Sequence, residues 1–146
     1  MKISSETRSV LKNFATINSG IKVEAGNQLK TISQMKNILA VATVPESFNQ
    51  EFSIYNLTEF LGATSLLDNP DFDFNDQSVS ISDNSSAMTY FYASEGMVTS
   101  PEKMITMPDA EIKVDISSSL LSELQKAASV LGVNDLVLES DGTTIK

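Results

Sequence analysis

Three amphipathic segments separated by short alternating runs limit the folds open to this chain. Each segment carries apolar residues at helical spacing over about three turns and follows a capping residue, which is Ser4 or Ser5, Asn56 or Ser117. We expect these helices to end near residues 18, 68 and 132. Between them, period-two patterns predict strands at residues 2–3, 21–24, 28–33, 37–44, 52–55, 72–74, 79–81, 88–92, 111–114 and 136–138. This order predicts an α+β fold with antiparallel sheets and with the helices on one side.

The segment Ser94–Asp109 breaks this rhythm, because it holds Gly96, Pro101 and Pro108 without a sustained period. After it the opening pattern returns, with serines, an amphipathic helix ended by glycine, an alternating strand and a glycine turn. We therefore expect a first domain at 1–93, a connector at 94–109 and a partial second domain at 110–146. A truncated gene or an excised fragment explains the short second part more simply than a natural short form.

Composition removes most kinds of catalytic centre. The chain has no Cys and no His, which excludes thiolate nucleophiles, histidine bases and zinc fingers. The acidic run Asp71–Asp76 resembles a calcium loop, but its sixth and twelfth positions are Asp76 and Ser82 in place of Gly and Glu. No apolar run approaches the roughly 20 residues of a membrane helix. We expect a soluble intracellular protein that is not an enzyme and that needs no metal or cofactor.

Charge is distributed unevenly along the chain. Residues 1–40 carry a net charge of +4 and residues 41–146 a net charge of −13. In the first helix, Arg8 and Lys12 lie one turn apart, away from an apolar face that includes Leu11 and Phe14. Such a stripe suits a sequence-independent phosphate contact, but a solvated helix face carries charges for no special reason. The residues alone leave both readings open.

Two segments have a more specific composition. They are Leu11–Ile21 (LKNFATINSGI) and Phe52–Gly62 (FSIYNLTEFLG), the second followed by Ser65-Leu66. Both resemble the sliding clamps of T-even-type bacteriophages, at the first helix with its following strand and at the second helix. Glu111-Ile-Lys resembles the opening of the second domain of that family. The resemblance implies a DNA-clamp fold, with one complete clamp domain and the start of a second, and with the helices on the inner face.

The resemblance also implies a function and a set of partners. Three two-domain subunits of such clamps form a ring around duplex DNA, tether the replicative polymerase and serve late transcription. A clamp loader opens the ring with ATP, and the clamp itself catalyses nothing. We expect the protein to be located in the cytoplasm of the infected bacterial host. The alternative is a non-enzymatic α+β interaction module that never encircles DNA.

Residue roles follow by position from the same resemblance. Arg8 and Lys12 are expected to face DNA from the first domain and Lys126 from the second, with Lys2 and Lys22 as further candidates. The second helix carries no Lys or Arg, and its exposed face is expected at Thr58, Thr64 and Ser65. Partner segments are expected to dock near the connector on Met97, Val98, Met104, Ile105 and Met107. Those five residues could equally serve only to anchor a crossing loop.

Overall fold

The chain forms two compact units, each described here by itself. The computed structural model describes residues 1–102, 109 and 113–143, and the units are Met1–Met104 and Ile105–Lys146. The first unit holds α1 (Ser5–Ile17), β1 (Ile21–Val23), β2 (Gly26–Ile32), β3 (Leu39–Phe48), β4 (Phe52–Ile54), α2 (Leu57–Thr64), β5 (Asp71–Phe74), β6 (Ser78–Ser82) and β7 (Ala87–Phe91). The second holds α3 (Ser118–Leu131). Helices and antiparallel sheets together confirm the predicted α+β class.

The helix ends are set by local capping, as the sequence predicts. The side chain of Ser4 accepts from the Thr7 amide at α1, that of Asn56 from the Glu59 amide at α2, and that of Ser117 from the Leu120 amide at α3. Gly132 ends α3 with a φ of 68°, a left-handed conformation that glycine adopts without strain. Only α2 differs from expectation. It is shorter than predicted, because it ends at Thr64 and not near residue 68.

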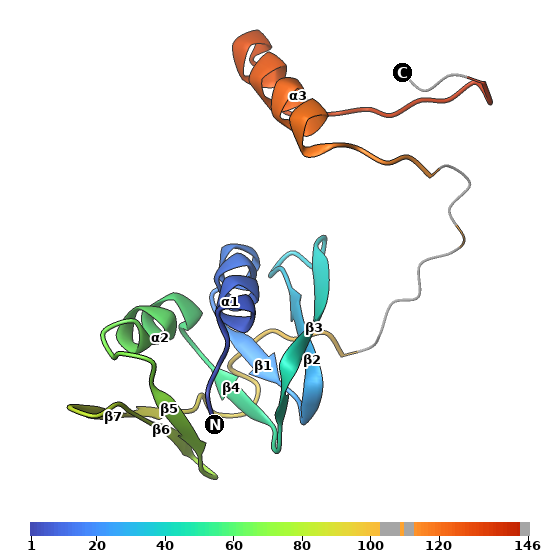
Figure 1. The fold of residues 1–146 in the computed structure, drawn as a ribbon. Coiled ribbons are helices and arrows are strands. Elements are labelled where there is room, and N and C mark those ends of the chain that lie inside the picture. Colours follow the sequence, from blue (N-terminus) through green and yellow to red (C-terminus); the bar gives the residue numbers. More distant parts are fainter. Residues whose placement is uncertain (103–108, 110–112, 144–146) are drawn as a thin grey trace. The chain divides into compact units, whose positions relative to one another are not determined.

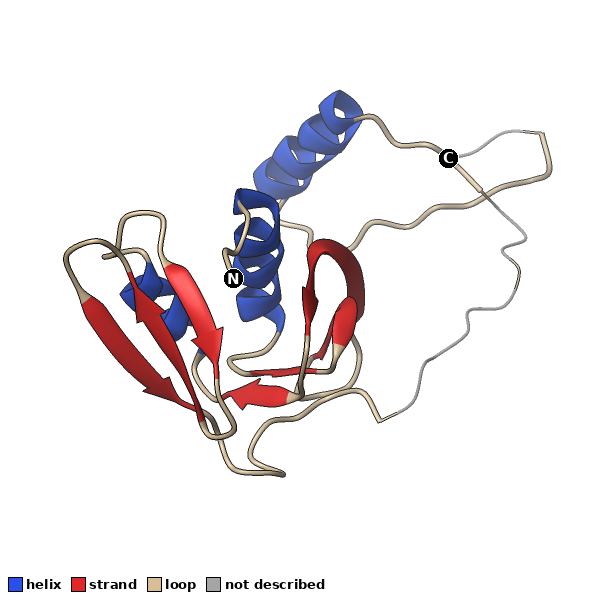
Figure 2. Ribbon diagram, turned by 60° about the horizontal axis from the view of Figure 1, so that its bottom comes forward, coloured by secondary structure: helices blue, strands red, loops and turns tan. Residues whose placement is uncertain are grey.

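The strands of the first unit form three small antiparallel sheets. The pairs are β1 with β4 and β2 with β3, and the third sheet has the order β5-β6-β7. Both views show α1 between the β2-β3 hairpin and the β5-β6-β7 sheet, and Figure 1 shows α2 beside it above the strands (Figures 1 and 2). The N-terminus joins the third sheet, because Met1 and Phe72 exchange backbone hydrogen bonds of 2.6 and 2.7 Å. The two helices thus share one side of the first unit.

The strand expected at 37–44 was predicted to end before Pro45, and this end is wrong. β3 continues through Pro45 to Phe48. Its register with β2 shifts, because Gln28 pairs with Thr43 whereas Gly26 pairs with Phe48. Residues 44–47 therefore oppose Asn27 alone, and this bulge accommodates a residue that has no N–H to donate to the ladder.

Aromatic side chains hold the sheets together in the core. Phe52 lies at the centre of one cluster, with ring centroids 4.9 Å from Phe74, 5.2 Å from Tyr92 and 5.6 Å from Phe48. Phe60 of α2 contacts the Tyr90 ring edge-on at 5.1 Å. Such ring pairs add stabilisation beyond the apolar area they bury. The core therefore ties α2 and β4 to the β5-β6-β7 sheet.

In the second unit, the described residues form α3 and segments without regular secondary structure on either side of it. The strand expected at 136–138 is wrong, since residues 133–139 have no regular secondary structure and no described segment pairs with them. The strand expected at 111–114 falls partly outside the described residues, and residues 113 and 114 are not in a strand. Among the described residues, no helix has both the length and the hydropathy needed for a membrane span.

Candidate nucleic-acid interface

Arg8 and Lys12 lie one turn apart on α1, as predicted. Arg8 is half-buried, and its Nε donates to the carbonyl oxygen of Ile3 at 3.2 Å. Lys12 is exposed. Neither has an ion-pair partner among the described residues, so both positive charges are available to an external anion. The α1 surface between them suits a contact with phosphate.

Two hollows flank this pair of bases. Arg8 borders one of about 490 Å³, whose wall includes Lys2, Ser4, Glu46 and Asn69. Lys12 borders a groove of about 380 Å³ between α1 and α2. The rest of that groove is small or uncharged, and its lining is Ala15, Thr16, Thr58, Leu61, Gly62 and Ser65. Lys12 is therefore the one charge among the described residues of the groove, which otherwise offers hydroxyl groups and close access.

The expected polar face of α2 is correct at two positions and wrong at the third. Thr58 and Ser65 are exposed. Thr64 is only 4% exposed, and its hydroxyl donates to the Leu61 carbonyl oxygen at 3.0 Å. The spacing explains the difference, because Thr64 follows buried Leu57 by seven residues and so lies on the same helix face.

The other three candidate bases lie in different surroundings. Lys2 pairs with Asp71 at 3.5 Å, and Lys22 pairs with Glu51 at 2.9 Å. The hydrogen bond to Glu51 raises the pKa of Lys22. Lys126 is exposed on α3 in the second unit. The structure thus brings Arg8 and Lys12 together, whereas Lys2 and Lys22 already have carboxylate partners.

A carboxylate from β3 caps the beginning of α1. Glu46 accepts hydrogen bonds from the Ser4 amide and from the Thr7 hydroxyl, and Thr7 is fully buried. Burial by itself raises the pKa of Glu46, but the bonds from Thr7 and Ser4 outweigh it, so the pKa is lowered. An anion at this place also interacts favourably with the helix dipole. Glu46 therefore fixes the helix that carries the two free bases.

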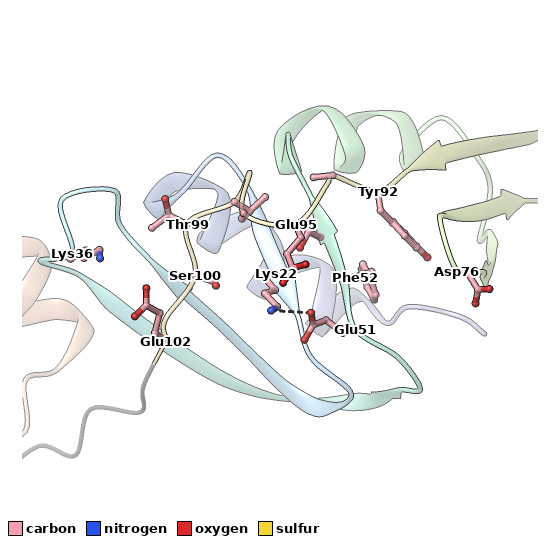
Figure 3. Close-up of a pocket in the computed structure, with 14 residues that line it drawn as sticks. Lys22, Lys36, Glu51, Phe52, Asp76, Tyr92, Glu95, Thr99, Ser100 and Glu102 are labelled. Carbon is pink, nitrogen blue, oxygen red and sulfur yellow. Dashed lines mark ion pairs between the residues drawn. The ribbon is translucent and has the colours of Figure 1, made fainter.

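A second candidate site lies where residues 93–102 cross the strands. We call it the connector cleft; it has a volume of about 730 Å³. In Figure 3, Tyr92 and Asp76 lie at one end, Lys36 at the other, and Thr99 and Ser100 between them. Lys22 and Glu51 face each other across the middle and form the ion pair drawn there (Figure 3). The remaining lining residues are Phe52, Ser53, Ala93, Glu95, Gly96, Val98 and Glu102.

The connector cleft is more acidic than the apolar pocket that we expected. Among the described lining residues, Glu51, Asp76, Glu95 and Glu102 outnumber the two lysines. Val98 belongs to the lining, and Met97 is 57% exposed. Burial raises the pKa of Tyr92 at its edge to about 12. The other three residues expected to bind a partner, Met104, Ile105 and Met107, lie outside the described residues.

Sequence reasoning missed Glu46 and the carboxylates of the cleft. Glu46 lies 39 residues from Thr7 along the chain, so no local pattern connects the two. The only signal was a helix N-terminus that an anion would complement. Among the described residues, no group of three or more Asp or Glu is arranged to hold a metal ion. The exposed bases and the cleft remain as candidate sites for macromolecular partners.

Comparison with known proteins identifies the family to which this chain is similar. The sequence profile described as DNA polymerase processivity factor matches residues 4–106. The sliding clamp of Vibrio phage KVP40 is 34% identical over 145 residues, which cover 97% of this chain and 66% of that protein. The sliding clamp of Enterobacteria phage T4 is 31% identical over 141 residues, covering 94% and 61%. That of Escherichia phage RB69 is 28% identical over 148 residues, covering 99% and 65%.

The chain is thus shorter than these relatives and spans 61–66% of their lengths. The matched profile nevertheless includes both helices of the first unit, all seven strands and the connector cleft. The resemblance noted at Leu11–Ile21 and Phe52–Gly62 lies inside the matched range. By this match, the chain belongs to the DNA polymerase processivity factor family.

Proposed function

We infer that this chain acts as part of a sliding clamp, a non-enzymatic ring that holds duplex DNA and tethers the replicative polymerase. The observation that carries the proposal is the pair Arg8 and Lys12 on α1, both without carboxylate partners among the described residues, in a chain of net charge −9. Acidic surfaces repel phosphate. Attraction to DNA is therefore confined to the few places where a Lys or Arg side chain has no carboxylate partner. Contacts of this kind do not read base sequence.

The geometry suits a weak and mobile contact with DNA. Lys12 borders a groove whose other polar groups are the uncharged hydroxyls of Thr16, Thr58 and Ser65. A single lysine side chain surrounded by small hydroxyl groups can release one DNA phosphate and contact the next as the duplex moves. Lys126 on α3 supplies a corresponding charge in the second unit, and Lys2 and Lys22 would need to leave Asp71 and Glu51 to contribute.

The connector cleft is the proposed docking site of the polymerase. Its volume of about 730 Å³ and its length from Lys36 to Asp76 suit an extended peptide segment (Figure 3). In the described part of the lining, four carboxylates against two lysines favour a polymerase segment that carries Lys or Arg. Val98 offers an apolar contact within the cleft, and Met97 offers another beside it. Met104, Ile105 and Met107 stay predictions for the same partner.

The assembly and its setting follow from the proposed function. Residues 1–93 form a clamp domain, 94–109 a connector and 110–146 part of a second clamp domain. Three subunits form the ring, and a clamp loader places it on DNA. The protein acts in the cytoplasm of the infected host. The support for this organisation is the likeness to the phage clamps and the return of a capped amphipathic helix at α3.

The experiment that tests the DNA contact is the double substitution Arg8→Ala with Lys12→Ala. Processive primer extension by the polymerase of the same source, with loader and ATP, is measured between 50 and 200 mM salt, about the range in which phosphate contacts weaken most. We expect the salt dependence to fall by about two phosphate contacts per chain. The melting temperature should fall only slightly, because Arg8→Ala also removes the hydrogen bond to the Ile3 carbonyl oxygen.

The matched control is Lys30→Ala with Lys113→Ala. It removes the same charge from β2 and from the exposed segment before α3, away from both α1 and the connector cleft. Equal effects of the two double variants would mean that net charge alone matters. No effect of the α1 variant at any salt concentration would remove Arg8 and Lys12 from the DNA contact.

A further inference from the structure

One buried side chain connects the end of α1 with β2 and the connector. Asn18 is 5% exposed and follows the last residue of α1. Its Nδ2 donates to the carbonyl oxygen of Ile32 at 3.0 Å and to that of Thr99 at 2.8 Å. Its Oδ1 accepts from the Gly20 amide at 3.3 Å. Three segments that are distant in sequence therefore meet at a single carboxamide.

The chemistry of this position is specific to asparagine. A primary amide presents two N–H donors and an acceptor, and here all three kinds of contact are made. An aspartate of the same shape has no donor and would direct negative charge at two carbonyl oxygens. An alanine would leave both carbonyl oxygens without this partner, the Ile32 oxygen in a buried place and the Thr99 oxygen in a partly buried one, which costs free energy.

The hydrogen bond between Asn18 and Thr99 is one of the few that attach the connector to the rest of the first unit. Across residues 93–102, the described hydrogen bonds to the rest of the first unit lie at two places. The Ala93 amide donates to the Ser53 carbonyl oxygen at 2.8 Å, and the Thr99 carbonyl oxygen accepts from Asn18. Between them, Val98 lies close over Gly20, since a Cβ on that glycine would be 3.2 Å from Val98 Cγ1. Asn18 therefore holds the far end of the segment that walls the connector cleft.

We propose that Asn18 is a positioning residue for the polymerase site, holding Thr99 and its neighbours so that the connector cleft keeps its shape. The proposal rests on the function proposed above for that cleft. Asn18 touches no partner itself; it acts through Val98, Thr99 and Ser100, which line the cleft. It also makes the end of the DNA-facing helix and the wall of the polymerase site parts of one hydrogen-bonded unit.

The test compares Asn18→Asp and Asn18→Ala with the full wild-type chain. Amide hydrogen exchange is followed at the Ala93 and Met97 amides, which donate the described hydrogen bonds of residues 93–102, and capture of the chain by the immobilised polymerase of the same source is measured in parallel. We expect exchange in the connector to rise by about five- to tenfold, the equivalent of one lost hydrogen bond. Polymerase capture should weaken by a similar factor, while exchange in β5 and β6 stays unchanged.

Two controls match these variants. Asn13→Asp makes the same chemical change at an exposed position of the same helix. Asn13→Ala matches Asn18→Ala in the same way. Neither control should change connector exchange or polymerase capture. Asn18→Ala introduces no buried charge, so it carries the test if the carboxylate prevents folding.

A pH series separates hydrogen bonding from a general loss of packing. Burial beside two carbonyl oxygens should raise the pKa of the carboxyl introduced by Asn18→Asp. Once protonated, that carboxyl regains one donor, so its excess exchange over wild type at the same pH should shrink as the pH falls. The excess of Asn18→Ala should stay constant.

The possible outcomes separate this proposal from the proposed function. Unchanged connector exchange in both Asn18 variants would overturn the positioning role. Faster connector exchange with undiminished polymerase capture would also overturn it, while the proposed function would stand. A wild-type chain that captures no polymerase would contradict the proposed function and, with it, the role of Asn18 in that site.

Discussion

The carboxylate of Glu46 on β3 accepts a hydrogen bond from the buried hydroxyl of Thr7 on α1. The same carboxylate accepts from the Ser4 amide at the cap of the helix. A strand residue therefore completes the capping of a helix that begins some forty residues earlier. Because Arg8 follows Thr7 directly, this contact also fixes the position of a basic side chain that we propose contacts DNA.

We predict that Glu46→Gln destabilises the first unit by about 1–2 kcal/mol near neutral pH, since a charge-assisted cap becomes a neutral one. The pKa of Glu46 is lowered in the folded chain, so its contribution is present above the unfolded pKa of about 4.3 and is lost as the pH falls through the folded value. Urea unfolding at neutral and acid pH should show the gap between variant and wild type closing in acid. Glu24→Gln, at an exposed ion pair with Lys30, is the control, and a gap independent of pH would contradict the prediction.

We predict that the Asp83 carboxyl group stays ionised to a lower pH than an ordinary aspartate. The backbone amides of Ser85, Asp68 and Ser86 donate to it and lower its pKa to about 2 from the usual 3.8. Its contribution to stability is therefore complete above about 3.8 and is lost as the pH falls toward about 2. A carboxyl titration followed by NMR should give a midpoint near the lower value. A midpoint at the usual value would show that these amide bonds do not persist in solution.

Two glycines should respond to alanine in opposite directions. At Gly20 a Cβ would lie 2.8 Å from the Ile54 carbonyl oxygen and 2.9 Å from that of Tyr55, so Gly20→Ala should cost about 1–3 kcal/mol. Gly62 in α2 has open space around the same position, and Gly62→Ala should stabilise by about 0.5–1 kcal/mol. Thermal unfolding of the two variants measures both effects. Similar changes in the two variants would mean that the close approach at Gly20 is absent in solution.

The second unit offers a test of its assigned role. If α3 belongs to a clamp domain, Lys126→Ala should reduce the salt dependence of processive synthesis by about one phosphate contact per chain. Lys113→Ala is the matched control, because Lys113 is also exposed but lies outside the helix. Indistinguishable salt dependences for these two variants would remove Lys126 from the DNA contact.

The sequence predicted those features that depend on neighbouring residues. Ser4, Asn56 and Ser117 cap the three helices as expected, since a cap is formed within one turn. Arg8 and Lys12 share a side of α1 for the same reason.

Features that depend on distant residues were not predictable. Asn18 and Thr99 are 81 residues apart, and the ion pair of Lys22 depends on β1 lying beside β4. The bulge at Pro45 depends on the cross-strand register, which a strand pattern alone does not define. Thr64 is a different case, because its spacing from Leu57 already indicated the buried face.

The bulge in β3 also bears on self-association. Within the described part of the chain β3 pairs only with β2, so its other edge has no strand beside it. A long open edge invites addition of a foreign strand and so promotes aggregation. The bulge around Pro45 bends the strand where a straight template would be needed. The residue that breaks the expected pattern of β3 therefore also helps to keep the first unit from aggregating through that strand.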